Sequence, residues 1–407
     1  MTSMFARVAD WAVRNRSKMP RWMGNAMESA AQNPDGFVGR LSAKLLGSGT
    51  GDVTEVPDGD ILVYIAPTNY AGQGYLWARA LEESSPNIGA RNSAVQLPGG
   101  YAFASNAQVP ITTVNASEKW AEAEWQAVRQ FTHVLVEAER SMFGKRFGRN
   151  LEAEISALVA EGLSIAFLCH GTDIRDPAKH AALTPWSPYP EDPRTDRLQV
   201  DARNNLALLE RMNLPTFVST PDLLLDVPWA HWCPVVVDGE RFANNSPIFV
   251  SPHPRIIHAS SNPLQKGSDR IEPALTPLLE SGAISYELIG STPSAEMPAV
   301  FAAADIVLDQ FRLGSYGVAA CEAMAAGRVV IGHVLPEVRQ LIKTSTGLSL
   351  PIVEATPDTL LEVVQSLLDS PEEARRIAAA GPRYVAELHS GAASARVLTD
   401  NWISPPG

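Results

Sequence analysis

Along most of this chain, short runs rich in β-branched and other apolar residues alternate with helical patterns, and the alternation begins twice. The apolar runs of the first series are residues 61–66, 93–97, 132–138, 164–169, 216–220 and 234–238. Those of the second series are residues 255–259, 285–289, 305–309, 328–333 and 350–353. Strands separated by helices are typical of parallel sheets, so each series predicts one doubly wound α/β domain.

A stretch with three prolines, residues 239–254, separates the two series. We therefore expect an N-terminal Rossmann-like domain at residues 51–245 and a C-terminal Rossmann-like domain at residues 246–387. The final helical segment, residues 388–407, is expected to return to the first domain. Ligands of such sheets bind outside the carboxyl ends of the strands. Two such domains facing each other across a hinge would enclose the functional site in a cleft.

The composition excludes several classes of protein. Apolar residues make up 45 % of the chain and charged residues 19 %, which predicts an ordinary globular core. No apolar run is long enough to cross a bilayer and no secretory signal is visible, so we expect a cytoplasmic location. The formal net charge of −12 argues against nucleic-acid binding. Cys169, Cys233 and Cys321 lie in apolar stretches without metal-ligand spacing and predict buried thiols.

The first 50 residues differ from the rest of the chain. They contain seven basic and three acidic residues together with Trp11 and Trp22, although the whole chain is acidic. A basic helical extension with aromatic residues is suited to an anionic membrane surface, so one interpretation is peripheral contact with the inner face of the membrane. The other interpretation is an extension that packs on the protein's own surface.

The segment at residues 305–333 is the most informative for function. An apolar run ends at Asp309, a glycine-containing loop at residues 313–317 opens a helix, and Glu322 follows about two turns later. Free N–H groups at a helix start favour a phosphate, and glycines allow a ligand to approach the backbone. A carboxylate can accept hydrogen bonds from the hydroxyls of a ribose. The spacing alone also fits an exposed glutamate on a surface helix.

The run from Glu322 to Gly327, Glu-Ala-Met-Ala-Ala-Gly, resembles the donor-binding signature of the retaining glycosyltransferases of family 4. That family has two glutamates eight positions apart, and Gly314 occupies the place of the first. The resemblance implies the GT-B fold, in which two Rossmann-like domains face each other across a cleft. It also implies a nucleotide-sugar donor bound by Gly314, Ser315, Tyr316, Gly317 and Glu322. Backbone N–H groups of the loop, Asp309 or Gln310 would replace the missing glutamate.

A second match lies upstream, where Lys266 precedes Gly267. It resembles the family's Lys-Gly pair, whose lysine meets the donor diphosphate. An ammonium suits that task because negative charge develops on the leaving phosphate. The family's accompanying arginine is absent near Pro263, so Arg270 or Arg312 would substitute for it. A lysine before a glycine is also common in ordinary turns.

Two segments of the first domain also predict site residues. Gly72 and Gly74 follow the first apolar run, in a loop that closes over the donor in the resembled family. His170 follows the run at residues 164–169, and a histidine at this place touches the donor sugar in that family. Asp173 and Arg175 are further candidates, with a structural Asp–Arg pair or a buried histidine as the alternatives.

The resemblance implies a hexosyltransferase that needs no cofactor and no metal and acts with retention of configuration. Its acceptor would be a glycan or a lipid-linked acceptor, as in cell-envelope glycan biosynthesis. The one Asp-x-Asp sequence, Asp58 to Asp60, precedes the first strand and predicts a turn rather than a metal site. The missing glutamate and arginine support an alternative function, a catalytically silent GT-B protein that binds a nucleotide or glycan as an interaction partner. An epimerase or phosphorylase of the same fold is a further alternative.

Overall fold

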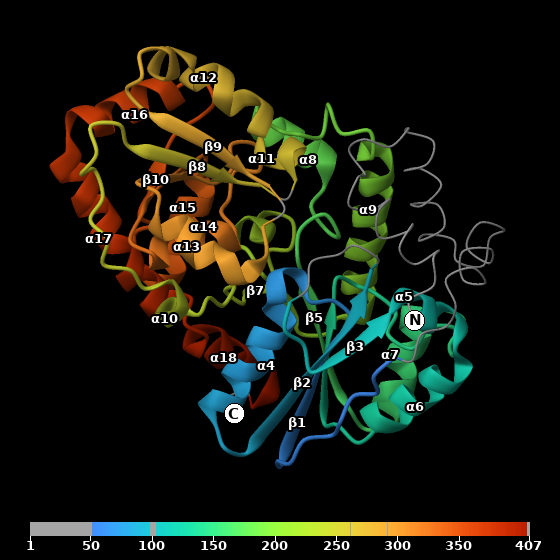
Figure 1. Cartoon of the computed structure of the whole chain (residues 1–407). Coiled ribbons are helices and arrows are strands. Elements are labelled where there is room, and N and C mark those ends of the chain that lie inside the picture. Colours follow the sequence, from blue (N-terminus) through green and yellow to red (C-terminus); the bar gives the residue numbers. More distant parts are fainter. Residues whose placement is uncertain (1–50, 98–102, 261, 291, 405–407) are drawn as a thin grey trace, which may run out of the picture. The chain divides into compact units, whose positions relative to one another are not determined.

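The computed structural model describes residues 51–97, 103–260, 262–290 and 292–404 (Figure 1). The predicted N-terminal helical extension and its membrane contact, residues 1–50, lie outside the described residues. The chain divides into two compact units, Met1–Ala166 and Phe167–Gly407. This boundary falls within a strand of the first sheet, and the predicted domain limits at residues 245 and 387 stay a prediction.

The described strands form two sheets, and every strand pair given by the structure is parallel. The seven-stranded sheet has the order β3-β2-β1-β4-β5-β6-β7 and the five-stranded sheet has the order β12-β11-β10-β8-β9. The strands of the first sheet are β1 (Ile61–Ala66), β2 (Ile88–Gln96), β3 (Ala107–Pro110), β4 (His133–Glu137), β5 (Ser164–Cys169), β6 (Thr216–Val218) and β7 (His231–Trp232). Those of the second are β8 (Arg255–Ala259), β9 (Ser285–Ile289), β10 (Ile306–Leu308), β11 (Val329–Gly332) and β12 (Ile352–Glu354).

Helices connect the strands in both units. In the first unit they are α4 (Gln73–Ser84), α5 (Ile111–Ala116), α6 (Glu118–Val128) and α7 (Leu151–Ala160), with a short 3-10 turn η2 (Tyr70–Gly72). In the second unit they are α8 (Pro177–Leu183), α9 (Thr195–Met212), α10 (Gly239–Phe242), α11 (Pro263–Lys266), α12 (Ser268–Glu280), α13 (Met297–Ala302), α14 (Val318–Ala325), α15 (Pro336–Thr346), α16 (Leu360–Asp369), α17 (Pro371–Leu388) and α18 (Ala392–Leu398). The remaining short elements are η3 (Pro221–Leu225), η4 (Ser294–Glu296) and η5 (Thr399–Ile403). Among the described residues, none of these helices is both long and apolar enough to cross a membrane.

The core of the five-stranded sheet explains why its strands read as continuous apolar runs. Ile256, Leu308 and Ile331 point to one face and pack with Leu275 of α12 and Val364 of α16. Their neighbours Ile257, Val307 and Val330 are equally buried on the other face. The central strands of a parallel sheet covered by helices on both faces need apolar residues at successive positions, as found here, whereas the edge strand β9 is largely exposed. Figure 1 shows α12 and α16 together on one side of this sheet and α13 and α14 on the other.

The strand runs predicted from the sequence are confirmed with one exception, and one further strand was not predicted. The run at residues 234–238 is not a strand, so that prediction is wrong; β7 lies just before it instead. Pro234 has no N–H to donate to a ladder, and the N–H of Val237 donates to the carbonyl of His389 at 2.8 Å. The edge strand β3 was not predicted, because Ala107–Pro110 has few β-forming residues and ends in proline.

Candidate functional site

The order of strands in the five-stranded sheet determines where a ligand can bind. The chain passes from β8 to the edge strand β9 and then crosses to β10, on the opposite side of β8. The connections that leave β8 and β10 therefore run in opposite directions, and ligands of such sheets bind outside the carboxyl ends of the strands at this point. The predicted residues Lys266 and Asp309 follow β8 and β10, so both lie at this edge of the sheet.

Lys266 and Asp309 form an ion pair at this edge. The Lys266 Nζ lies 3.1 Å from Asp309 Oδ1 and donates to the carbonyl of Ala259 at 2.9 Å. The other carboxylate oxygen of Asp309 accepts a hydrogen bond from the backbone N–H of Gly317, at 3.4 Å. Asp309 is almost fully buried, whereas Lys266 keeps about a sixth of its side chain exposed. The aspartate thus holds the ammonium beside the first residues of α14, where it remains accessible to a ligand.

Gly314 stands where the resembled family has its first glutamate, and the structure closes this position to any side chain. Its φ of 66° lies in the left-handed region. A Cβ built on Gly314 would lie 2.5 Å from Cγ of Leu335, well inside van der Waals contact. Leu335 is buried, and its N–H donates to the Gly314 carbonyl at 2.9 Å, so the two residues are held together. A carboxylate side chain at residue 314 would therefore overlap Leu335 in this structure.

This geometry predicts that Gly314→Ala destabilises the protein by about 1–3 kcal/mol through the forced φ and the overlap with Leu335. Gly282 is a matched control because its φ is 69° and no atom lies within 4 Å of the position that an added methyl group would take. Gly282→Ala should therefore show the cost of φ alone. Denaturant unfolding of both variants measures the difference. Equal losses at the two positions would contradict the assigned contact with Leu335.

Ser315 and Tyr316 are buried, which limits what they can offer a ligand. The Tyr316 hydroxyl lies 3.1 Å from the Tyr384 hydroxyl and 3.2 Å from Nε2 of His389. Burial raises the pKa of the Tyr316 phenol well above its usual value, so it stays protonated. The side chain of Tyr316 thus points into the protein, and this loop presents its backbone. Gly317, by contrast, has no other atom within 4 Å of the position that an added Cβ would take.

Glu322 lies on α14 and is the predicted ribose contact. Its carboxylate accepts no hydrogen bond from any described residue, although most of the side chain is removed from solvent. Burial raises the pKa of Glu322 to about 7, against the opposing effects of the positive charges of Arg241 and Lys266. A partly buried carboxylate without a protein donor, close to two cations, is suited to a ligand that supplies hydroxyl donors.

Arg241 was missed by the sequence reasoning. It lies on α10, inside the proline-containing stretch that interrupted the strand pattern, and its guanidinium donates to the carbonyl and the hydroxyl of Ser294. No local motif marks it, because its relation to Glu322 arises from residues far apart in the sequence.

The residues predicted after β5 form a tight turn rather than a mutual pair. The carboxylate of Asp173 accepts hydrogen bonds from the backbone N–H groups of His170 and Gly171. Arg175 pairs instead with Asp222, with Nη2 and Oδ2 at 2.5 Å, and both side chains are buried. The sequence analysis gave an ion pair between Asp173 and Arg175 as an alternative, and the structure does not contain that pair. His170 remains half-buried at the carboxyl end of β5.

The predicted glycines of the first unit lie at the start of α4. Gly72 is its N-cap with a φ of 78°, a left-handed conformation that favours glycine. Gly74 has no room for a side chain, because a Cβ there would lie 2.5 Å from Nδ2 of Asn92. Asn92 is fully buried and donates to the carbonyls of Ile65 and Thr68. Both glycines therefore shape the loop that follows β1.

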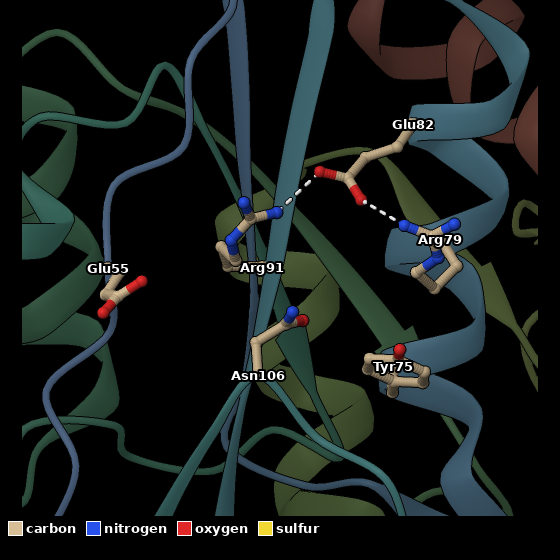
Figure 2. Close-up of a pocket in the computed structure, with 6 residues that line it drawn as sticks. All are labelled: Glu55, Tyr75, Arg79, Glu82, Arg91 and Asn106. Carbon is tan, nitrogen blue, oxygen red and sulfur yellow. Dashed lines mark hydrogen bonds and ion pairs between the residues drawn. The ribbon is translucent and has the colours of Figure 1, made fainter.

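A polar pocket of about 380 Å³ in the first unit shares no residue with the predicted site (Figure 2). Figure 2 shows Glu82 between two arginines, with 2.6 Å to Arg91 and 3.3 Å to Arg79. The other lining residues are Glu55, Tyr75 and Asn106. The pocket's ion pairs satisfy one another, which is typical of a solvated surface hollow.

Arg270 and Arg312, the predicted substitutes for the missing arginine, meet at one carboxylate. Both donate to Oε1 of Glu191, at 3.0 Å from Arg270 and 2.6 Å from Arg312. Glu191 precedes α9 and is far from both arginines in the sequence, so sequence reasoning gave no signal for it. The structure therefore brings Arg270 and Arg312 together next to the turn that carries Lys266.

One family model matches the C-terminal part of the chain. Residues 273–400, which include Glu322 and all of α14, match the family described as "Glycosyl transferase-like". This part of the chain is thus similar to a glycosyltransferase-like domain. A search of curated proteins found no match to the sequence.

Comparison with solved structures identifies the fold. Sucrose-phosphate synthase from Thermosynechococcus elongatus aligns with a TM-score of 0.53 at 12 % identity, over 83 % of this chain and 96 % of that one. HepE of Anabaena, in complex with UDP and glucose, aligns with a TM-score of 0.52 at 10 % identity, over 85 % and 99 %. The catalytic domain of starch synthase IV from Arabidopsis thaliana, bound to ADP and acarbose, gives 0.50 at 11 % identity, over 83 % and 98 %. The predicted GT-B architecture is confirmed.

Proposed function

We propose that this protein is a glycosyltransferase that moves a sugar from a nucleotide-sugar donor to a hydroxyl group of an acceptor. The observation that carries the proposal is the carboxylate of Glu322. It lies partly buried on the helix that follows the glycine loop, near the charges of Lys266 and Arg241, and accepts no hydrogen bond from the described residues. Ribose hydroxyls would supply those hydrogen bonds, and the match to a glycosyltransferase-like family covers this helix.

Each remaining group has a role in this proposal. Lys266 stabilises the negative charge that develops on the leaving nucleoside diphosphate as the bond to the sugar breaks. The N–H groups at the start of α14, beside Gly317, add hydrogen bonds to the same phosphates. Asp309 keeps Lys266 in place, through the ion pair at 3.1 Å, and is a positioning residue. His170 and the loop of Gly72 and Gly74 would meet the sugar.

Three finer features rest on the family resemblance. We propose that the transferred group is a hexose and that transfer retains the configuration at the sugar carbon. The leaving phosphate would then help to take the proton of the acceptor, which attacks from the same face. We propose a glycan or lipid-linked acceptor, as in cell-envelope glycan synthesis, and catalysis without a metal or other cofactor.

The proposal is tested by Glu322→Ala, which should weaken nucleoside diphosphate binding by about 1–3 kcal/mol, the usual contribution of charge-assisted hydrogen bonds. That loss corresponds to about 5- to 150-fold in Kd. Calorimetric titration with a panel of nucleoside diphosphates measures it. Unchanged affinity for a nucleotide that the wild type binds would contradict the role of Glu322 as ribose contact.

Glu322→Gln supplies an independent control of the same site. The folded-state pKa of Glu322 is about 7, above its ordinary value, so the folded state binds the extra proton. The stability that this residue contributes is therefore present at low pH and is lost as pH rises through about 7. Glu322→Gln should raise the melting temperature of the ligand-free protein more at pH 8 than at pH 5. If Glu322→Gln binds nucleotide more weakly than the wild type but has a higher melting temperature at pH 8, the weaker binding does not result from misfolding.

A second candidate function is a catalytically silent protein of the same fold that binds a nucleotide or glycan. The observation that favours it is the closed position at Gly314, since the family's first carboxylate cannot be placed there. Slow donor hydrolysis without acceptor distinguishes the two functions. Nucleotide binding without any donor turnover, with or without candidate acceptors, would favour the silent protein.

A further inference from the structure

Glu191 is the one acidic side chain shared by Arg270 and Arg312 in the described part of the chain. A single oxygen, Oε1, lies 2.6 Å from Nη2 of Arg312 and 3.0 Å from Nη2 of Arg270. About half of the Glu191 side chain is exposed to solvent, whereas only 4 % of the Arg312 side chain is. A buried cation is thus neutralised by a carboxylate that itself lies at the surface.

The position of Arg312 is set by the backbone around it. Its aliphatic chain lies against Gly267, where an added Cβ would come within 3.0 Å of Cγ of Arg312. The second guanidinium nitrogen of Arg312 donates to the carbonyl of Leu264 at 3.3 Å. The backbone N–H of Phe311 donates to the carbonyl of Lys266, which joins the loop after β10 to the turn after β8. Arg312 is therefore a fixed part of the predicted phosphate edge.

Glu191, in contrast, depends on Arg270 and Arg312 for its position. Its neighbour Asp192 is held by Arg194, at 2.8 Å, so the backbone of this loop has its own anchor. The hydrogen bond from Arg312 holds the pKa of Glu191 below its ordinary value, so the carboxylate is ionised at neutral pH. An ionised oxygen between two guanidinium groups has the charge and the donor geometry that a phosphate oxygen would have at the same place.

We propose that Arg312 and Arg270 form a phosphate-binding site that Glu191 fills when no ligand is bound, so that an incoming phosphate displaces Glu191. The inference rests on the proposed function in one respect: the phosphate is that of the nucleotide-sugar donor. Glu191 then acts as an internal competitor of the donor. It keeps the charge of Arg312 paired in the empty site, where an unpaired buried cation would be costly.

The test compares the affinity of the wild type and of Glu191→Gln for inorganic pyrophosphate, measured by calorimetry in low salt. When a site is accessible in only a fraction of the molecules, the apparent Kd of its ligand equals the intrinsic Kd divided by that fraction. Removing the competing carboxylate should therefore tighten pyrophosphate binding by about three- to tenfold. Arg312→Gln should weaken binding by a larger factor, since it removes a group that contacts the ligand.

Asp269→Asn is the matched control. Asp269 is also exposed and also pairs with Arg270, at 3.2 Å, but it does not contact Arg312. If displacement of Glu191 causes the tighter binding, Asp269→Asn should change the affinity for pyrophosphate by less than about twofold. A general effect of removing one negative charge would tighten binding in both variants. Equal tightening in Asp269→Asn and Glu191→Gln would overturn the proposal, as would unchanged or weaker binding in Glu191→Gln.

Titration with nucleoside diphosphates separates this inference from the proposed function. One outcome is that Glu191→Gln binds pyrophosphate more tightly while neither protein binds a nucleoside diphosphate. This outcome supports the anion site and contradicts the proposal of a nucleotide-sugar donor. Nucleotide binding that depends on Glu322 but does not change in Glu191→Gln supports the donor and overturns displacement. Pyrophosphate bound by neither protein would also overturn the anion site. The melting temperature of each variant shows that it is folded.

Discussion

Replacing Lys266 by alanine should lower kcat by about 100- to 1000-fold, the loss measured when one preorganised donor to a developing negative charge is removed. The charge on the leaving diphosphate is larger in the transition state than in the bound donor. The ammonium therefore acts mainly on the rate, and the Michaelis constant should change much less. Steady-state kinetics with a matched donor and acceptor measure both constants.

The expected size of this effect depends on the position of Lys266 in the structure. The ammonium is held by the carbonyl of Ala259 and by the buried carboxylate of Asp309, so it needs little reorganisation when charge develops nearby. Lys343, an exposed lysine on α15 that donates to the Gly347 carbonyl, is a suitable control, and Lys343→Ala should leave kcat unchanged. If Lys266→Ala raised only the Michaelis constant, Lys266 would be a binding residue without a special role in the transition state.

Asp222→Ala should destabilise the second unit by about 3–5 kcal/mol, because it leaves the guanidinium of Arg175 buried without a counter-charge. The two side chains are 4 % and 7 % exposed, and their closest atoms lie 2.5 Å apart. The exposed pair of Arg255 and Glu287 is the control, and Glu287→Ala should cost at most about 1 kcal/mol. Denaturant unfolding measures both losses.

A double variant shows whether the charge is the cause. Arg175→Met combined with Asp222→Ala removes the unpaired cation, so it should recover part of the stability that Asp222→Ala loses. A double variant that is as unstable as the sum of both single variants would mean that the buried volume, rather than the charge pair, is responsible.

The same pair makes a prediction for pH. Burial alone would raise the pKa of Asp222, but the Arg175 guanidinium beside it holds the pKa below its ordinary value. Asp222 therefore contributes stability above its unfolded pKa of about 4, and this stability is lost as pH falls through the lower folded value. The difference in the free energy of unfolding between the wild type and Asp222→Ala should accordingly be largest at pH 7 and should decrease below about pH 4.

The sequence predicted those parts of the fold and site that depend on local patterns. Strand runs and the helix that carries Glu322 follow from periodicity and from the glycine loop, and both are in the structure. Asp309 was placed at the end of an apolar run and Lys266 after the run at residues 255–259, and a parallel sheet brings the segments that follow its strands to one edge. Their ion pair could not be read from the sequence, since the two residues lie 43 positions apart.

The remaining features depend on contacts between distant segments. Asp173 and Arg175 are close in the sequence, which made their pairing a natural alternative, but Arg175 pairs with Asp222 across 47 positions. Glu191 meets Arg312 across 121 positions. The burial of Tyr316 likewise depends on Tyr384 and His389, from the C-terminal part of the chain. No local pattern contains this information, because side chains far apart in the sequence determine it.

The contact between Gly314 and Leu335 restricts how this sequence can change over evolution. A carboxylate at residue 314 would require both a smaller residue at 335 and a new backbone conformation in the loop, because φ is 66° and Leu335 lies where a Cβ would be. Gly314→Glu alone would clash, and Leu335→Ala alone would leave a cavity in the core. Either first step lowers stability before the second can restore it. The two positions are therefore epistatic, and an acidic residue at position 314 is difficult to reach by single substitutions.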